Sequence, residues 1–304
     1  MRIAVVGTGA LGGWYAGLLA AAGHEVHCVA RSDHAIIAAD GLTLRESGTS
    51  RVVRIASATA DGAGVGPCDL VVIAVKSTAN PGLPALVGPL SGPSSIALTL
   101  QNGMGNVEAL AALMPTERIV AGLCFVCINR VAPAIIDTTL AGYVRMAAAQ
   151  GPANPAVAAC VGLFAHAGVD CRAEDSLEAV LWKKLCWNIP FNGLAIAAGS
   201  RTTDRLLADD GHRTRARRLM KEVQAAALAC GHGFDDQHID RQFTVTALMG
   251  PYRPSSLVDF TTGREVEVEG IWGIPLARGE SRGVAMPETR RLLSEIRGCL
   301  AARG

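Results

Sequence analysis

The stretch RIAVVGTGALG at residues 2–12 decides the fold of this chain. Arg2–Val6 is a short apolar run that ends at a glycine, which predicts a buried strand of a parallel sheet. The residues up to Ala22 predict a tight turn and a helix closed by Gly23, and Glu25–Ala30 predicts a second strand. The stretch between the strands is long enough for a crossover helix, so we expect a βαβ unit.

The glycines of this first turn have the G-x-G-x-x-G spacing of a dinucleotide-binding loop. Gly7 permits the tight turn, Gly9 lets the backbone approach a pyrophosphate, and Gly12 lets the helix pack on the strand. The free N–H groups at the helix start then face the phosphates. The alternative is a glycine-rich turn that binds nothing, which the complete βαβ context disfavours. The expected cofactor-binding loop comprises Gly7, Thr8, Gly9, Ala10, Leu11 and Gly12.

The end of the second predicted strand selects the cofactor. NAD enzymes usually carry an acidic residue there for the ribose hydroxyls, whereas this chain has Arg31 followed by Ser32. Arginine binds a 2′-phosphate through charge-assisted hydrogen bonds, so NADP(H) is the expected cofactor. In the alternative, Arg31 is an ordinary surface residue and Asp33 binds the ribose.

The remaining pattern predicts two domains. Further strands are expected at 69–75, 95–100, 119–128 and 143–147, with a helix at 105–113 and one or two short antiparallel strands within 41–58. Beyond residue 172 the periodicity is helical, at 177–187, 213–230, 237–249, 265–278 and 287–302. We therefore expect an α/β chain, with a Rossmann-type parallel-sheet domain at 1–172 that binds NADP and an all-helical substrate and catalytic domain at 173–304.

Composition limits the partners. Of 304 residues, 50% are hydrophobic and 18% charged, and the net charge is +1, so no nucleic-acid surface is expected. No apolar run spans a bilayer, and the nine cysteines suggest no disulfide framework, which favours the cytoplasm. Cys124 and Cys127 form a lone CxxC without further ligands, so no metal site is expected. A homodimer is the one assembly we consider.

Polar residues also gather at predicted strand ends and on one predicted helix. Lys76 ends the third strand of the βαβ series, and Asn102 follows the fourth, at the carboxyl edge where ligands bind. In the segment LWKKLCWNIPFN, Lys184, Asn188 and Asn192 share one helix face at i, i+4 and i+8. A solvated helix face is the alternative, and Pro190 is expected to bend this helix.

Taken in order, these motifs resemble the ketopantoate reductases (2-dehydropantoate 2-reductases) over essentially the whole chain. The matching segments are GTGALG, Arg31, the run IAVK that ends at Lys76, QNGMG, LWKKL with the two asparagines, PSSLVDFTTGREVEVEG and GVAMPE.

The resemblance implies roles for individual residues. Lys184 looks like the lysine that polarises and protonates the keto oxygen, and Glu267 like the active-site glutamate; Asn102 and Lys76 would lie near the cofactor and the reacting centre. Asn188, Asn192 and Ser255 resemble the groups that hold the substrate. The expected reaction is NADPH-dependent reduction of a 2-keto acid to a 2-hydroxy acid, with 2-dehydropantoate, a precursor in pantothenate biosynthesis, as the substrate the family implies.

Several positions depart from the family pattern. Asn192 is preceded by Phe191 and followed by Gly193 where a proline is usual, and Trp272 stands where an asparagine is usual. A bulky aromatic there is expected to reshape an acyl pocket. Two alternatives therefore stay open: a related 2-keto acid reductase or D-2-hydroxyacid dehydrogenase with another substrate, and a non-catalytic NADP-binding sensor.

Overall fold

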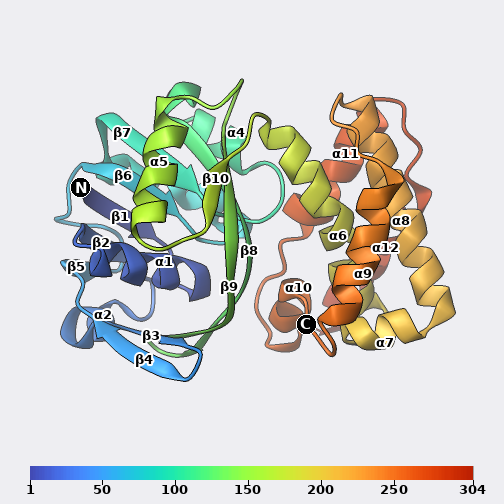
Figure 1. Ribbon diagram of the computed structural model, residues 1–304, viewed down its shortest axis with the longest axis horizontal. Helices are drawn as coiled ribbons and strands as arrows, with labels where there is room; N and C mark the ends of the chain where they lie inside the picture. The colour runs from blue at the N-terminus through green and yellow to red at the C-terminus, as the bar shows by residue number, and fades with distance from the viewer. Residues whose placement is uncertain (304) are drawn as a thin grey trace. The chain divides into compact units, whose positions relative to one another are not determined.

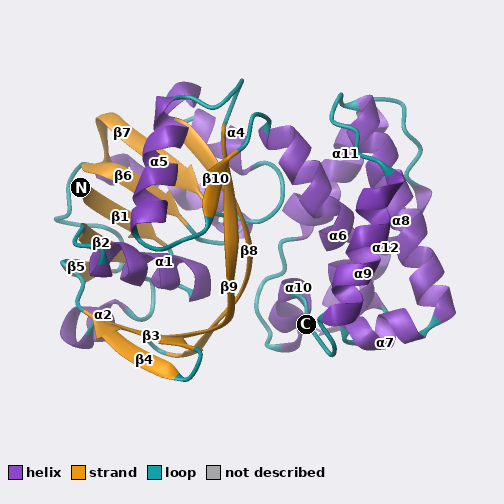
Figure 2. Cartoon of the chain, in the orientation of Figure 1, coloured by secondary structure: helices purple, strands orange, loops and turns teal. Residues whose placement is uncertain are grey.

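A computed structural model of the chain describes residues 1–303. Its contacts divide the chain into two compact units. Unit 1 comprises Met1–Gln101 and Asn106–Leu177, and unit 2 comprises Asn102–Gly105 and the chain from Glu178 onward. Strands and helices alternate along unit 1, whereas unit 2 contains only helices among its described residues (Figure 2).

Unit 1 is built on one sheet of ten strands (Figure 1). The strands are β1 (Arg2–Val6), β2 (Glu25–Val29), β3 (Leu42–Glu46), β4 (Thr49–Val53), β5 (Ser57–Thr59), β6 (Cys68–Ile73), β7 (Ser91–Thr99), β8 (Ile119–Ala132), β9 (Ile135–Ala148) and β10 (Cys171–Ala173). Their order is β4-β3-β9-β8-β7-β6-β1-β2-β5, and β10 also pairs with β9.

The central strands of the sheet are parallel, and the direction in which the chain adds new strands reverses at β1. From β1 the chain adds β2 on one side and later β6 on the other, with both pairings parallel. Such a reversal opens a crevice at the carboxyl ends of the strands, where ligands of open α/β sheets bind. The glycine loop after β1 therefore starts at the position that this topology favours for a dinucleotide.

The side chains of β1 alternate between two hydrophobic cores, one on each face of the sheet. Ile3 and Val5 pack in one core with α1 (Ala10–Ala21) and α5 (Pro155–His166). Ala4 and Val6 pack in another with α3 (Leu83–Val87) and α4 (Asn106–Ala111). The remaining helical segments of unit 1 are α2 (His34–Asp40), η1 (Ser77–Gly82), η2 (Gly88–Leu90) and η3 (Thr116–Arg118). Helices on both faces explain why these strands are apolar throughout.

Unit 2 surrounds the long helix α6 (Leu177–Ala197), which continues through Pro190. The core around it contains Trp182, Ile189 and Trp272, each fully buried. Its other helical elements are α7 (Thr203–Ala208), α8 (Asp210–Ala229), α9 (Asp236–Leu248), α10 (Ser255–Thr261), the π-helical η4 (Glu269–Gly273), α11 (Ile274–Ser281) and α12 (Pro287–Arg303). Within residues 1–303, no helix is both long and apolar enough to cross a membrane.

The fold class predicted from the sequence is confirmed, and three details differ. The predicted strands at 119–128 and 143–147 extend into a long antiparallel pair of 14 residues each. The segment at 41–58 forms the expected antiparallel pair, β3–β4, and also β5, which is parallel to β2. The predicted helix at 265–278 is irregular up to Glu267, because Glu265–Val268 alternates charged and apolar residues with a period of two rather than 3.6.

All nine cysteines are free thiols. Burial raises the pKa of the Cys28, Cys160 and Cys186 thiols to about 12. A thiol with so high a pKa carries almost no nucleophilic thiolate at neutral pH. These three cysteines therefore act as small apolar core residues.

A carboxylate from α8 caps the start of α12. Glu222 accepts hydrogen bonds from the backbone N–H groups of Glu288 and Thr289 and from the Thr289 hydroxyl, each at 2.8 Å. Thr289 is fully buried. The contact satisfies N–H groups that have no partner inside α12 and places negative charge at the positive end of its dipole.

We expect Glu222→Gln to lower the free energy of unfolding by about 1–3 kcal/mol, because the amide loses the charge and turns a donor towards other donors. The control is Asp240→Asn, which removes an exposed ion pair with Arg217 and should cost less than about 1 kcal/mol. Denaturant unfolding measures both. Equal effects of the two substitutions would show that the cap contributes nothing beyond a surface charge.

Candidate active site

The glycine loop of unit 1 has the geometry of a dinucleotide-binding turn. A Cβ on Gly12 would overlap the carbonyl oxygen of Gly7 and lie 2.9 Å from the Cβ of Ala74, so only glycine allows α1 to start this close to β1. A Cβ on Gly9 would meet nothing within 4 Å. The backbone at Gly9 is therefore exposed and open to an approaching pyrophosphate, and the loop fits the cofactor that its spacing predicts.

The other loop residues contribute mainly backbone. Thr8 is buried, and within residues 1–303 its hydroxyl oxygen has no hydrogen-bond partner. Ala10 and Leu11 begin α1 and are partly exposed. The start of α1 has no side-chain cap, which suits N–H groups that bind an anion.

Arg31 and Asp33 follow β2 and differ in environment. Arg31 is exposed. Asp33 is buried, and its carboxylate accepts hydrogen bonds from Arg130 at 2.6 Å and from the backbone N–H of Ala134 at 3.2 Å. Both contacts go to one carboxylate oxygen, and Ser32 donates to the other at 2.7 Å, so both oxygens of Asp33 are engaged by the protein, whereas Arg31 is exposed.

Lys76 follows β6 and precedes η1, at the same edge of the sheet as the glycine loop. A chain of side-chain amides holds this segment: Gln101 donates to Asn80 at 2.7 Å, and Asn80 donates to Asn106 at 3.0 Å. Sequence reasoning missed Asn80 and Asn106. In the sequence, Asn80 and Asn106 are marked only by the polar residues that follow the two apolar strands before them.

In unit 2 the structure brings two of the predicted catalytic residues together. The Lys184 ammonium on α6 donates a hydrogen bond to the side-chain oxygen of Asn102 at 2.8 Å. Asn102 stands next to Gly103, whose φ is +81° and whose Cβ, if present, would overlap the carbonyl group of Gly270. The N–H of Met104 donates to that same carbonyl at 2.8 Å. Gly103 thus permits the close backbone contact that sets Asn102 beside Lys184.

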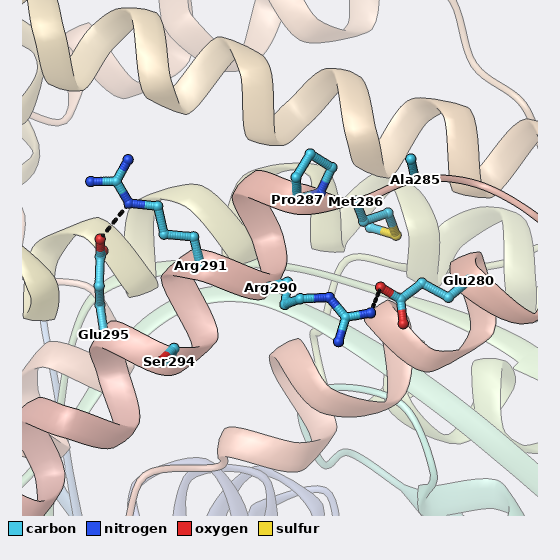
Figure 3. A pocket seen from close by; sticks show the side chains of 8 residues that line it. All are labelled: Glu280, Ala285, Met286, Pro287, Arg290, Arg291, Ser294 and Glu295. Carbon is cyan, nitrogen blue, oxygen red and sulfur yellow. Dashed lines mark hydrogen bonds and ion pairs between the residues drawn. The ribbon is translucent and has the colours of Figure 1, made fainter.

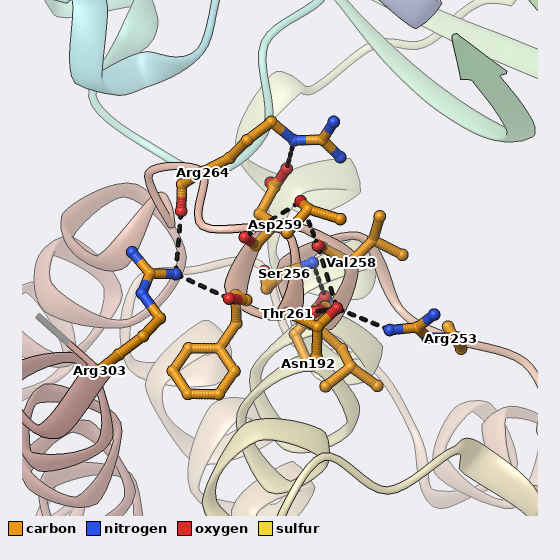
Figure 4. Close-up of polar contacts among 11 residues, drawn as sticks. Asn192, Arg253, Ser256, Val258, Asp259, Thr261, Arg264 and Arg303 are labelled. Atoms are coloured by element: carbon orange, nitrogen blue, oxygen red, sulfur yellow. Dashed lines mark hydrogen bonds and ion pairs between the residues drawn. The ribbon is translucent and has the colours of Figure 1, made fainter. Parts of the chain in front are cut away.

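Asn188 and Asn192 lie on the same helix as Lys184, and both are buried. The side-chain oxygen of Asn192 accepts from the N–H of Ser256 at 3.0 Å (Figure 4). The same oxygen lies 3.5 Å from the hydroxyl of Ser255. Asn192 therefore fixes the first residues of α10. Two of the three residues of the predicted polar stripe are therefore buried, and Lys184 is half-buried; the solvated alternative does not hold for the two asparagines.

Glu267 lies in the irregular segment before η4 and is 8% exposed. Its neighbour in sequence Glu269 forms an exposed ion pair with Arg297 at 2.7 Å. A π-helical turn is rare in proteins and is found most often at functional sites. The segment that carries Glu267 is thus next to the π-helical turn whose Gly270 contacts Gly103.

The departures from the family pattern lie in the core of unit 2. Phe191 and Trp272 are fully buried, and the Trp272 indole donates to the carbonyl of Ile189 at 3.0 Å. A Cβ on Gly193 would lie 3.0 Å from the Trp272 indole nitrogen and 2.5 Å from Leu292. Gly193 leaves space beside Trp272 and Leu292, and both aromatic side chains pack in the interior of unit 2; their expected effect on an acyl pocket stays a prediction.

A pocket elsewhere in unit 2 does not offer a comparable site. Figure 3 shows its lining around the start of α12, where Arg290 pairs with Glu280 and Arg291 pairs with Glu295. The first N–H groups of α12 are already bound by Glu222. Its charged groups are therefore neutralised by the protein itself. Within residues 1–303, no group of three or more His, Cys, Asp or Glu side chains is placed to hold a metal ion.

Comparison with known proteins gives the family. The profile described as "Ketopantoate reductase PanE/ApbA" matches residues 3–151, and "Ketopantoate reductase PanE/ApbA C terminal" matches residues 176–299. The chain belongs to this family. The resemblance drawn from the sequence motifs is confirmed.

Individual relatives span the whole chain. A 2-dehydropantoate 2-reductase of Nostoc sp. is 36% identical over 97% of this chain and 94% of its own length. The crystal structure of 2-dehydropantoate 2-reductase from Geobacter metallireducens superposes with a TM-score of 0.94 at 36% identity, covering 98% of this chain and 99% of that chain. D-mandelate dehydrogenase, solved with NADH and anilino(oxo)acetate, shares the fold at 19% identity with a TM-score of 0.91, over 100% of this chain and 99% of that one.

We expect Gly103→Ala to lower the free energy of unfolding by about 2–4 kcal/mol, since it adds overlap with Gly270 to the cost of a left-handed alanine. The control Gly263→Ala, at φ +72° with nothing within 4 Å of its Cβ, should cost only about 1 kcal/mol. Thermal or denaturant unfolding of both variants measures the difference. Equal losses would mean that the contact with Gly270 is not restrictive.

Proposed function

We propose that this protein is an NADPH-dependent 2-dehydropantoate 2-reductase, which reduces the keto group of 2-dehydropantoate to the hydroxyl group of pantoate. The observation that carries the proposal is the Lys184–Asn102 contact of 2.8 Å. It holds the half-buried Lys184 ammonium in one orientation on a helix face that also carries two buried asparagines, which a protein that only senses a dinucleotide does not need. Family membership supports the same reaction.

Lys184 is the proton donor in this proposal. Negative charge grows on the keto oxygen during reduction, and an oriented ammonium both stabilises that charge and supplies the proton. Asn102 accepts one N–H of Lys184, which restricts rotation of the ammonium and fixes its direction. Glu267 is proposed as the second catalytic residue, a carboxylate that accepts a hydrogen bond from the substrate.

Asn188, Ser255 and Asn192 are proposed to bind the 2-keto acid, with different contributions. Asn188 and Ser255 supply polar atoms that orient its carboxylate and carbonyl before reaction, which removes orientational freedom. Asn192 is 1% exposed and its oxygen is engaged with α10. Its contribution is therefore to hold Ser255 in place.

The family uses a nicotinamide cofactor, and we propose NADP(H) for this chain. When bound, the cofactor supplies the hydride. Residues Gly7 to Gly12 would bind its pyrophosphate through backbone N–H groups, and Arg31 its 2′-phosphate through a bidentate contact. Lys76 and Asn102 would complete the binding site.

The similarity to a 2-dehydropantoate 2-reductase, at 36% identity over 97% of this chain, supports 2-dehydropantoate over other 2-keto acids. The nine free thiols support a reducing compartment, and we propose the cytoplasm.

A panel of 2-keto acids tests the proposal. We expect the highest kcat/KM with 2-dehydropantoate and NADPH, with lower values for 2-oxoisovalerate and phenylglyoxylate and for NADH with each acid. A preference for phenylglyoxylate would identify a hydroxyacid dehydrogenase instead. NADPH binding without turnover of any acid would identify a sensor.

We expect Lys184→Ala to lower kcat by about 10²–10⁴-fold, the contribution of a positioned proton donor, with NADPH affinity retained. Lys183→Ala is the matched control, since the neighbouring lysine on the same helix is exposed, and it should leave kcat unchanged. Steady-state kinetics and fluorescence titration of NADPH give both quantities. Near-normal turnover of Lys184→Ala would refute its role.

A further inference from the structure

Asp33 makes an unusual set of contacts for a residue at the start of a helix. It is the residue that precedes α2, a position where aspartate normally caps the helix with its side chain. Here the carboxylate makes no such cap. It turns away to Arg130 and to the backbone N–H of Ala134, residues 97 and 101 positions further along the chain in the same unit.

The partner turn between β8 and β9 is built around this carboxylate. Ala134 has φ +56°, a left-handed conformation that costs an alanine about 1 kcal/mol. Its N–H binds Asp33 and its carbonyl accepts from the N–H of Thr43 at 2.8 Å. The left-handed conformation of Ala134 is thus held by hydrogen bonds at both its N–H and its carbonyl, which offset its backbone strain.

The ion pair keeps the Asp33 carboxylate charged and occupied. Burial opposes ionisation of Asp33, but the hydrogen bonds from Ser32, Arg130 and the Ala134 amide outweigh it and lower the pKa of the carboxyl below its usual value. The carboxylate side chain is 6% exposed, whereas that of Arg130 is 37% exposed. The charge of Asp33 is therefore neutralised by a guanidinium that itself reaches solvent.

The place of the Asp33–Arg130 pair, just after β2, bears on which cofactor the protein selects. An acidic side chain just after the second strand binds the ribose hydroxyls of NAD and repels the 2′-phosphate of NADP. Asp33 is two residues from Arg31 and lies in that region of the fold. Left unpaired, it would compete with Arg31 by electrostatic repulsion of the phosphate.

We propose that Arg130 is a positioning residue for NADPH selectivity: it withdraws and neutralises Asp33, so that the loop after β2 presents Arg31 to a 2′-phosphate without an opposing carboxylate. This inference rests on the proposed NADPH-dependent function. It assigns a specificity role to a residue of β8, far in sequence from the dinucleotide-binding motif.

Binding of NADPH and of NADH to the full chain, measured by nucleotide fluorescence without any keto acid, tests the inference. In Arg130→Met we expect NADPH to bind about tenfold more weakly and NADH no more weakly than in the wild type, a shift of about 1.4 kcal/mol in preference. The double variant Arg130→Met/Asp33→Asn removes the freed charge and keeps an oxygen to accept from Ala134. It should recover the NADPH preference.

Arg172→Met is the matched control, because Arg172 is an exposed arginine of the same unit with a 4.0 Å contact to Asp170; it should change neither affinity. Equal weakening of both cofactors in Arg130→Met, without recovery in the double variant, would show a structural role only and overturn the inference. A wild type that prefers NADH would overturn it as well. A wild type that binds neither dinucleotide would instead refute the proposed function.

Discussion

The contact between Gly103 and Gly270 is the constraint on which the arrangement of the catalytic residues depends. The segment Asn102–Gly105 follows a strand of the sheet, yet it packs as part of the helical unit. Met104, 2% exposed, contributes to the core of that unit, and its N–H binds the Gly270 carbonyl. A glycine is needed at position 103 for the backbones to approach this closely. Asn102 is held beside Lys184 as a result.

The same contact involves a π-helical turn. Gly270 lies within the turn Glu269–Gly273, and its carbonyl accepts the hydrogen bond from Met104. The irregular residues before the turn include Glu267. A uniform α-helix over 265–278 would have changed the direction of every side chain in this segment.

Much of the fold could be predicted from the sequence because its signals are local. The apolar run of β1, the glycine spacing after it and the helical periodicity beyond residue 176 each depend on residues close in the chain. The boundaries of β8 and β9 could not, because their pairing joins residues on two long strands with three irregularities in register. The Arg130–Asp33 pair could not be predicted either, because its members are 97 residues apart and Arg130 belongs to no motif.

The candidate site shows the same division, and its departures from the family pattern show how buried positions depend on one another. From the sequence, Trp272 is a bulky aromatic expected to reshape an acyl pocket, and Gly193 replaces a usual proline with no visible connection to it. In the structure the two positions are in contact, since a Cβ on Gly193 would lie 3.0 Å from the indole nitrogen of Trp272, which donates to the Ile189 carbonyl. Buried positions in contact vary together because the interior is close-packed. A residue next to a catalytic motif in sequence thus says little about the substrate until it is known whether its side chain faces the ligand or the core.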